Sequence, residues 1–291
     1  MKIKELLGRD TLSLSFEVFP PKTETVYESV KRATEEIAAL RPSFMSVTYG
    51  AGGGTSRYTL EIAKNIKERY GVPSLAHLTC VSSTRATVSE RIAAIREAGI
   101  ENVMALRGDI PAELRDADRS GWDYRYAIDL VRELRAAGDF CIGAACYPEI
   151  HPESADRRAD VRYLREKVEA GVDFLTTQMF FDNNLLYSFL YRIREAGITV
   201  PVLPGIMPIT NGRQVARAIA LSGSLVPQRF KALVDKFGSD PAAMKQAGIA
   251  YATDQSIDLF ANGITTVHVY SMNNPDVARS IMENLSDILG K

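Results

Sequence analysis

The stretch Ala105-Leu106-Arg107-Gly108-Asp109-Ile110-Pro111 decides the fold of this chain. An apolar run from Asn102 to Leu106 has the pattern of a buried strand, and it ends abruptly in an arginine, a glycine and a carboxylate before Pro111 stops it. A strand that ends in this way presents charge at its carboxyl end. Seven other apolar runs also end in a polar or turn residue, and helix-patterned segments separate them.

The repeated pattern predicts eight strands with helices between them. The strands are expected at 11–19, 44–48, 74–79, 102–106, 141–146, 174–178, 200–203 and 265–270. Helices are expected at 25–40, 84–98, 124–136, 159–170 and 275–289. A further helix begins after a cap at Thr55 or Ser56, another ends near Ala196, another begins at Asn211, and two more lie within 227–263.

Strands that alternate with helices pair in parallel through right-handed crossovers. A doubly wound sheet is the alternative architecture. The count of eight strands and the lack of a long linker favour a closed α/β (β/α)8 TIM barrel, with the extra helices before the last strand, over residues 1–291 as a single domain. In such a barrel the active site lies where the strands end.

The composition of the chain limits the kinds of partner that it is expected to bind. Of the 291 residues, 46% are hydrophobic and 24% charged, and the net charge of -1 provides no general attraction to nucleic acid or to an anionic membrane. The first ten residues contain too short an apolar stretch for a secretory signal, so a cytoplasmic location is expected. Three cysteines without CxxC spacing do not predict a disulfide framework. His77 and Cys80 point to opposite faces of a strand, so no metal site is expected.

If the barrel forms, its carboxyl-terminal rim collects groups that can bind a ligand or transfer a proton. They are Glu17, Thr48, His77, Arg107, Asp109, Tyr147, Gln178 and Tyr270. Glu17 has no cation close in sequence, which predicts a raised pKa and suits a general acid. The alternative is a carboxylate paired with a barrel arginine.

Other candidates carry similar alternatives. Arg107 and Asp109 share one side of an extended strand, where they could form a structural ion pair, although Gly108 between them is typical of a close approach by a ligand. His77 could be a core histidine with satisfied hydrogen bonds. Gln178 could bind the amide edge of a heterocycle or face water.

Three further features have weaker signals. The glycines at 50 and 52–54 could cradle a phosphate at a helix N-terminus, but their order is not a dinucleotide-binding fingerprint. Asp160 and Lys167 share a helix face that could bind ligand or face solvent. Tyr124 and Tyr126 could stack on a ring or cover the core.

Seven motifs together resemble the methylenetetrahydrofolate reductase family. They are Ser15-Phe-Glu-Val-Phe-Pro-Pro21, His77-Leu-Thr79, Leu106-Arg-Gly-Asp109, Tyr147-Pro-Glu-Ile-His-Pro152, Thr177-Gln178, Pro204-Gly205-Ile206 and Val267-His-Val-Tyr270. Each motif is weak alone, but all seven occur in order over nearly the whole chain.

The resemblance implies a barrel that binds FAD, takes hydride from NADH or NADPH and passes it to 5,10-methylenetetrahydrofolate in a ping-pong scheme. The product would be 5-methyltetrahydrofolate, which belongs to one-carbon metabolism and methionine biosynthesis. Glu17 looks like the general acid that protonates N10 of the folate. Asp109 looks like a carboxylate near the flavin and the pterin, and Gln178 like a pterin contact. Gln214 and Tyr270 join the substrate-binding set.

The resemblance also implies a set of residues that hold the FAD, with Arg107 as the partner of its phosphates. The set is Thr48, His77, Arg107, Gly108, Asp109, Tyr126, Ala127, Tyr147, His151, Asp160 and Lys167.

Two positions depart from the family pattern. Ala218 stands where some members have a phenylalanine that stacks on nicotinamide and folate, and Asn274 stands where an arginine that grips the folate tail is common. The electron donor is therefore open, and an accessory redox subunit is an alternative to a free nicotinamide. A homo-oligomer is expected. The alternative functions are a flavin-bearing subunit of a larger redox complex and a barrel methyltransferase or aldolase that handles a pterin without flavin.

Overall fold

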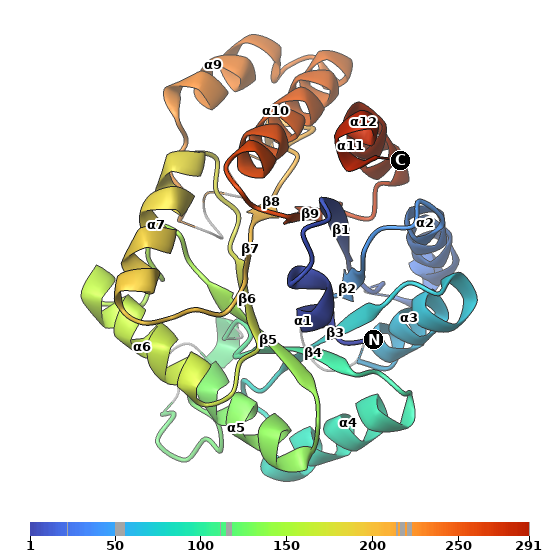
Figure 1. Cartoon of the computed structure of the whole chain (residues 1–291). Coiled ribbons are helices and arrows are strands. Elements are labelled where there is room, and N and C mark those ends of the chain that lie inside the picture. Colours follow the sequence, from blue (N-terminus) through green and yellow to red (C-terminus); the bar gives the residue numbers. More distant parts are fainter. Residues whose placement is uncertain are drawn as a thin grey trace.

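The fold is a ring of parallel strands surrounded by helices (Figure 1). It comes from a computed structural model that describes residues 1–21, 23–49, 56–110, 112–114, 118–213, 215, 219 and 223–290. Within these residues one sheet has the strand order β7-β6-β5-β4-β3-β2-β1-β9-β8, and every pair in it is parallel. The predicted α/β barrel is confirmed, whereas the assignment of residues 1–291 to a single domain stays a prediction.

The elements follow one another as the alternating pattern predicts. The strands are β1 (Ser13–Val18), β2 (Met45–Val47), β3 (Ser74–Thr79), β4 (Asn102–Leu106), β5 (Cys141–Cys146), β6 (Phe174–Thr177), β7 (Val202–Leu203), β8 (Gly205–Ile206) and β9 (Thr266–Tyr270). The helices are α1 (Ile3–Leu7), α2 (Tyr27–Ala39), α3 (Ser56–Tyr70), α4 (Arg85–Glu97), α5 (Ala127–Ala137), α6 (Arg157–Glu169), α7 (Asn183–Glu195), α9 (Gln228–Phe237), α10 (Pro241–Ala261), α11 (Pro275–Asn284) and α12 (Ser286–Leu289). Two short 3-10 helices are η1 (Glu24–Val26) and η2 (Ala112–Leu114).

The seventh predicted strand is split in two. The prediction placed it at 200–203, whereas the structure has β7, a break at Pro204, and then β8. Proline has no N–H to donate, so the ladder is interrupted there. β7 pairs with β6, while β8 pairs with β9, and the Pro204 carbonyl accepts a hydrogen bond from the His268 N–H at 2.8 Å. This split strand joins the two ends of the sheet and closes the barrel.

Side chains alternate between the outer core and the barrel interior. In β1, Leu14, Phe16 and Val18 belong to the core under the helices, whereas Ser15 and Glu17 lie inside the barrel with histidines of other strands. A second apolar cluster fills the amino-terminal part of the interior. Its buried members are Ile3, Phe44, Leu75, Met104, Cys141, Phe174 and Leu203. The amino-terminal part of the interior is therefore apolar, and the polar groups lie nearer to the carboxyl-terminal end of the barrel.

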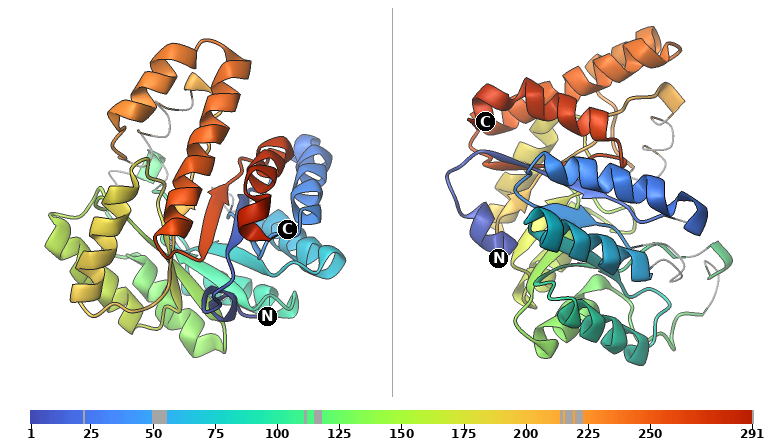
Figure 2. Two further views of the ribbon diagram at one scale, coloured as in Figure 1. Left: turned by 45° about the horizontal axis from the view of Figure 1, so that its top comes forward. Right: turned by 90° about the vertical axis from the view of Figure 1, so that its right-hand side faces the viewer.

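Helix α1 closes the amino-terminal end of the barrel, at the opposite end from the loops that follow the strands (Figure 2, right). Ile3 is fully buried in the interior cluster, and its N–H donates to the Asn102 side-chain oxygen at 2.8 Å. The sequence analysis did not predict this helix. Five residues are too few to produce a recognisable helical period.

The bounds of α5 and of the last helix also differ from the prediction. α5 begins at Ala127 and not at 124, because the Asp129 carboxylate accepts the backbone N–H of Tyr126 and fixes the helix start there. The last helix divides at Leu285 into α11 and α12. The two extra helices predicted before the last strand are confirmed as α9 and α10.

None of the helices within the described ranges is both long and apolar enough to cross a membrane. In the same part of the chain, no three His, Cys, Asp or Glu side chains come together as ligands for a metal ion.

Candidate active site

The carboxyl ends of the parallel strands bring the predicted groups to one rim. Glu17 is the last residue but one of β1, His77 lies in β3, Arg107 follows β4, and Tyr270 ends β9. Because every strand runs in the same direction, residues far apart in sequence meet at this end of the barrel.

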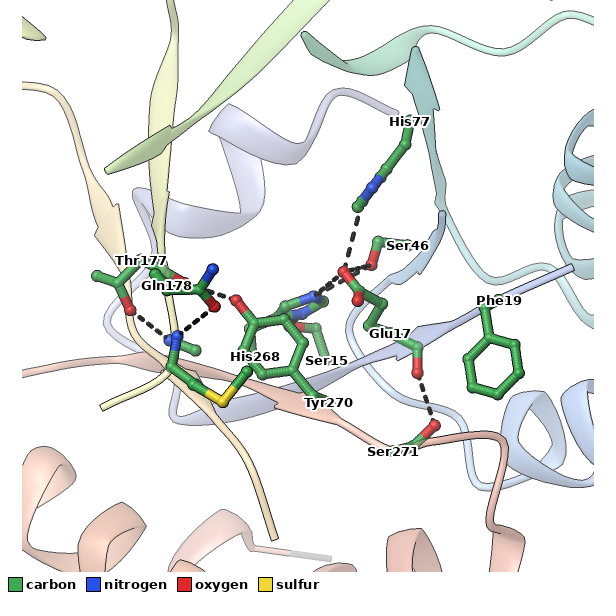
Figure 3. A network of polar contacts seen from close by, with 12 residues as sticks. Ser15, Glu17, Phe19, Ser46, His77, Thr177, Gln178, His268, Tyr270 and Ser271 are labelled. Atoms are coloured by element: carbon green, nitrogen blue, oxygen red, sulfur yellow. Dashed lines mark hydrogen bonds and ion pairs between the residues drawn. The ribbon is translucent and has the colours of Figure 1, made fainter. Parts of the chain in front are cut away.

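Glu17 lies at the centre of a polar network inside the barrel (Figure 3). Its Oε2 is 3.5 Å from Nε2 of His77 and 3.8 Å from Nε2 of His268. The Ser46 hydroxyl donates to the same oxygen at 3.3 Å. The side chain of Glu17 is 21% exposed and those of the two histidines 8% and 1%, so the carboxylate is the part of this cluster nearest to solvent.

The predicted raised pKa of Glu17 is wrong. Burial opposes ionisation and taken alone would raise the pKa, but His268 at 3.8 Å, the nearby His77 and the Ser46 hydroxyl together outweigh it. The pKa of Glu17 therefore lies below its usual range in the ligand-free protein. The alternative of an arginine partner is also wrong, because histidines of β3 and β9 take that place.

His77 is a buried histidine with an unsatisfied nitrogen. Among the described residues its Nε2 has no hydrogen-bond partner, which excludes the alternative of a satisfied core histidine. Burial lowers its pKa, and the neighbouring Glu17 only partly offsets this effect. Burial thus favours the neutral imidazole, while the Glu17 carboxylate favours its protonated form. A buried imidazole nitrogen without a partner at a rim is available to a ligand.

Tyr270 and Gln178 lie on the side of the network opposite to His77 (Figure 3). The Tyr270 hydroxyl donates to the Thr177 carbonyl at 2.6 Å, and burial raises its pKa well above the usual value. The Gln178 side-chain oxygen accepts the N–H of Met179 at 2.9 Å. That contact fixes the amide group at the rim, so the side chain does not simply extend into water.

The Arg107 side chain pairs with Glu153, so the alternative of a structural Arg107–Asp109 ion pair is wrong. The guanidinium donates to both carboxylate oxygens of Glu153, at 2.6 and 2.8 Å, whereas Asp109 is exposed. Gly108 has φ +89°, and a Cβ there would lie 2.9 Å from the Val81 side chain. The backbone between Arg107 and Asp109 therefore needs glycine, and it turns the two charged side chains apart.

The loop after β5 and the helix α6 add a second group of polar residues. The Tyr147 and His151 rings meet edge to face with their centroids 4.6 Å apart, and burial raises the pKa of Tyr147 to about 12. Lys167 donates to the Ala145 carbonyl at 2.6 Å, and burial lowers its pKa. Asp160 accepts the Ser154 hydroxyl at 2.9 Å. Asp160 and Lys167 are both partly buried, so they do not form the solvated face that was the alternative.

The remaining predicted residues lie around the same rim or outside the described part. Thr48 follows β2 and accepts the Thr59 hydroxyl through its carbonyl at 2.9 Å. Tyr126 is 62% exposed and precedes Ala127, the first residue of α5, whereas Tyr124 is buried in the core. Gln214, Ala218, the glycines at 50 and 52–54, and the caps predicted at Thr55 or Ser56 lie outside the described residues or side chains. Asn274 caps α11, its side-chain oxygen accepting the N–H of Val277 at 3.2 Å.

Four residues that shape the site were not predicted from the sequence. They are Ser15, Ser46 and His268 beside Glu17, and Glu153 beside Arg107. A usable signal was present, since His268 and Tyr270 are two residues apart on a predicted strand and therefore point to the same face. The pairing of β1 with β9, which brings His268 to Glu17, could not be read from either strand alone.

The rim has the features that a flavin with phosphates requires. Arg107 supplies a fixed guanidinium, the partly buried Lys167 supplies an ammonium group, and His77 supplies a buried nitrogen without a partner among the described residues. Arginine forks suit phosphate oxygens, and buried donors suit the polar edges of a ring system. The chemistry of these donors therefore fits such a cofactor.

Comparison with known proteins gives a consistent family. The family model described as methylenetetrahydrofolate reductase matches residues 2–286. The chain is 36% identical over 283 residues to 5,10-methylenetetrahydrofolate reductase of Pectobacterium carotovorum, covering 97% of this chain and 92% of that protein. It is 34% identical over 274 residues to the protein of the same name from Escherichia coli K12, covering 94% of this chain and 90% of the relative.

Plant relatives are longer, and a solved structure shares the fold. The chain is 36% identical over 295 residues to methylenetetrahydrofolate reductase (NADH) 1 of Zea mays, of which it spans about half the length (50%). An uncharacterized protein from Clostridium thermocellum that binds two copies of 5-methyl-5,6,7,8-tetrahydrofolic acid has a TM-score of 0.68 at 13% identity, covering 100% of this chain and 99% of that one. At this identity the likeness shows the fold alone.

Proposed function

Because the chain belongs to the methylenetetrahydrofolate reductase family and is an oxidoreductase, we propose that it reduces 5,10-methylenetetrahydrofolate to 5-methyltetrahydrofolate with FAD as its cofactor. When bound, the flavin supplies the hydride chemistry, receiving it from a reduced nicotinamide and passing it to the folate in turn, which is a ping-pong scheme. The observation that carries the proposal is the Glu17 carboxylate, which lies at the rim with a histidine on either side.

Glu17 is proposed as the general acid. Its carboxyl holds the proton that goes to N10 of the folate, which opens the bridging ring and leaves an electrophilic iminium carbon. Its lowered pKa means that the carboxyl is ionised at neutral pH before ligands bind. Ligands that cover the 21% of the side chain now exposed remove water from it, and removal of water favours the neutral, protonated carboxyl.

The residues around the rim are proposed to hold the flavin. Arg107 and Lys167 suit its phosphates, and the unsatisfied nitrogen of His77 suits a polar edge of its ring system. Tyr147, His151, Gly108 and Asp160 surround these groups, with Thr48, Tyr126 and Ala127 further along the rim.

Four residues are proposed to bind the folate together with Glu17. Asp109 is exposed at the rim, and its negative charge would also act electrostatically on the bound flavin. Gln178 presents an amide, and Tyr270 closes the side of the site nearest to Thr177. Gln214 completes the set as a prediction from the sequence. An amide can donate and accept at once, as recognition of a pterin edge requires.

NADH or NADPH is the proposed electron donor, and an accessory redox subunit is the alternative source. Ala218 and Asn274 are the positions at which donor and folate-tail recognition would differ from the family pattern. A homo-oligomer and a cytoplasmic location complete the proposal.

Glu17→Gln tests the proposed role of the carboxylate. In the variant, flavin reduction by a chemical reductant should proceed within about twofold of the wild-type rate, whereas reoxidation by methylenetetrahydrofolate should fall by about 100-fold or more, the usual contribution of a general acid. Both half-reactions are followed by the flavin absorbance under anaerobic conditions.

The control is Glu90→Gln, which removes an exposed carboxylate from α4. Wild-type folate reoxidation in the Glu17 variant would contradict the assigned role. A purified chain that binds no flavin would favour the pterin-handling methyltransferase or aldolase, and a flavin that the folate never reoxidises would favour a subunit of a larger redox complex.

A further inference from the structure

His268 is held between two serines in the interior of the barrel. Its Nδ1 is 2.8 Å from the Ser15 hydroxyl and its Nε2 is 3.1 Å from the Ser46 hydroxyl. Its side chain is 1% exposed, and Phe44 stacks on it with ring centroids 5.6 Å apart. The ring is therefore fixed in orientation, and both nitrogens have a hydroxyl partner.

The hydrogen bonds of these groups can be counted. The Ser46 hydroxyl has one proton and lies between the Glu17 carboxylate, at 3.3 Å, and Nε2 of His268. If Ser46 donates to Glu17, Nε2 must be the donor to Ser46. The Ser15 hydroxyl donates to the Val267 carbonyl at 3.4 Å, and Nδ1 must then be the donor to Ser15. All four contacts are satisfied together only when the imidazole carries two N–H groups.

The neutral imidazole has a different arrangement. With one N–H, on Nδ1, Nε2 becomes an acceptor and Ser46 turns its proton towards it. The contact from Ser46 to Glu17 then needs a proton on the carboxyl. The network therefore has two satisfied states that contain the same number of protons, an imidazolium with a carboxylate and a neutral imidazole with a carboxylic acid.

We propose that His268 is a positioning residue that stores a proton and returns it to Glu17 through the Ser46 hydroxyl, an inference that rests on the proposed function of Glu17 as proton donor. In this transfer the N–H bond at Nε2 breaks as the proton passes to Ser46 Oγ, and the Ser46 O–H bond breaks as its proton passes to Glu17 Oε2. The positive charge on the ring and the negative charge on the carboxylate disappear together. Glu17 is then protonated while bound ligands exclude water.

The other groups that face Glu17 are less suited to this role. His77 of β3 lies 3.5 Å from the carboxylate with no hydroxyl between them, and its Nε2 has no hydrogen-bond partner among the described residues. Tyr270 of β9 donates its hydroxyl proton to the Thr177 carbonyl. His268, in contrast, is connected to Glu17 through the Ser46 hydroxyl, as a proton relay requires, and its other ring nitrogen contacts the Ser15 hydroxyl.

Nitrogen-15 NMR of the purified, flavin-bound protein tests the stored proton directly. The chain has only three histidines, so the His77→Gln and His151→Gln variants assign the imidazole signals of His268. From the hydrogen-bond count we expect both ring nitrogens of His268 to carry protons in the wild type. In Glu17→Gln, measured under the same conditions, only one of the two nitrogens should carry a proton. Two protonated nitrogens in that variant as well would overturn the proposal.

The rate of folate-driven flavin reoxidation against pH tests the relay. In His268→Gln and in Ser46→Ala, Glu17 must take its proton from solvent, so the rate should fall about tenfold at pH 7.5 and stay within about twofold of wild type at pH 5.5. Ser46→Ala leaves the histidine in place, which keeps the test valid if His268→Gln fails to fold.

Ser13→Ala is the matched control. It removes the 3.0 Å contact between the Ser13 hydroxyl of β1 and the Thr266 hydroxyl of β9, the strand that carries His268. This variant should keep the wild-type pH profile. If Glu17→Gln abolishes reoxidation while Ser46→Ala and a folded His268→Gln both keep the wild-type profile, the relay is wrong and the function of Glu17 stands. If Glu17→Gln retains reoxidation, the proposed function fails and the relay fails with it.

Discussion

Glu17 shows why a single residue could be found from the sequence while its electrostatics could not. Its position at the end of a predicted strand identified it as a rim carboxylate, and the structure places it there. Its partners His77 and His268 lie on β3 and β9, 60 and 251 positions further along the chain. The absence of a neighbouring cation in sequence was therefore no guide to its pKa, because the barrel brings distant strands together.

Asp173 makes a pH-dependent contribution to stability. Burial opposes its ionisation, but the Ile142 N–H at 2.8 Å, the Arg135 guanidinium and the Lys4 ammonium at 3.1 Å outweigh this and lower its pKa. Asp173→Asn should reduce the free energy of unfolding by about 2 kcal/mol at pH 7. Because the folded-state pKa is the lower one, the stabilisation is present above the unfolded-state pKa of about 4 and is lost as the pH falls through the folded-state value.

Urea unfolding of Asp173→Asn and of the wild type between pH 7 and pH 3 measures this contribution. The difference between the two proteins should shrink as the pH falls below about 4. Asp139→Asn is the control at the same end of the barrel. It removes an exposed carboxylate that pairs with Lys2, and it should leave the unfolding midpoint unchanged. A difference that stayed constant over this range would contradict the account.

At the scale of elements, local signals set what could be predicted. β3, β4 and β5 match their predicted bounds because polar or turn residues flank each apolar run. The split into β7 and β8 depends on pairing with two different neighbours, which a run of residues does not reveal. Helix α1 is stabilised by burial of Ile3 in the barrel interior, a tertiary contact with no local signature.

Helix α10 packs unusually close to the segment after β8, and Gly248 makes this possible. A Cβ at Gly248 would lie 1.8 Å from the Ile209 carbonyl oxygen. Gly248→Ala should therefore reduce the free energy of unfolding by about 3 kcal/mol, since the helix or the segment must move. The gain of about 1 kcal/mol in helix propensity does not offset this cost.

Thermal or urea unfolding of Gly248→Ala measures the effect, with Gly121→Ala as the matched control. No heavy atom lies within 4 Å of a Cβ at Gly121, so that variant should change stability by no more than about 0.5 kcal/mol. Equal stability of the two variants would mean that α10 can shift without cost.

At the scale of the whole molecule, alternation of strands and helices was sufficient to predict the barrel and the end at which the candidate residues gather. What it could not predict was the pairing inside the rim, such as Arg107 with Glu153 and Glu17 with two histidines. These contacts depend on the closed ring, because the split strand β7–β8 brings β9 and its histidine next to β1. The site therefore forms only when the barrel closes, and no single segment of the chain contains it.

The central claim is that this one chain reduces methylenetetrahydrofolate through a bound flavin. The most direct test is an anaerobic stopped-flow experiment on the purified chain, following flavin absorbance at about 450 nm. The flavin is reduced with NADH, NADPH or a chemical reductant and then mixed with methylenetetrahydrofolate. We expect a reduced nicotinamide to bleach the flavin and the folate to restore its absorbance on mixing. A flavin that stays reduced in the presence of methylenetetrahydrofolate, whichever reductant was used, would contradict this claim.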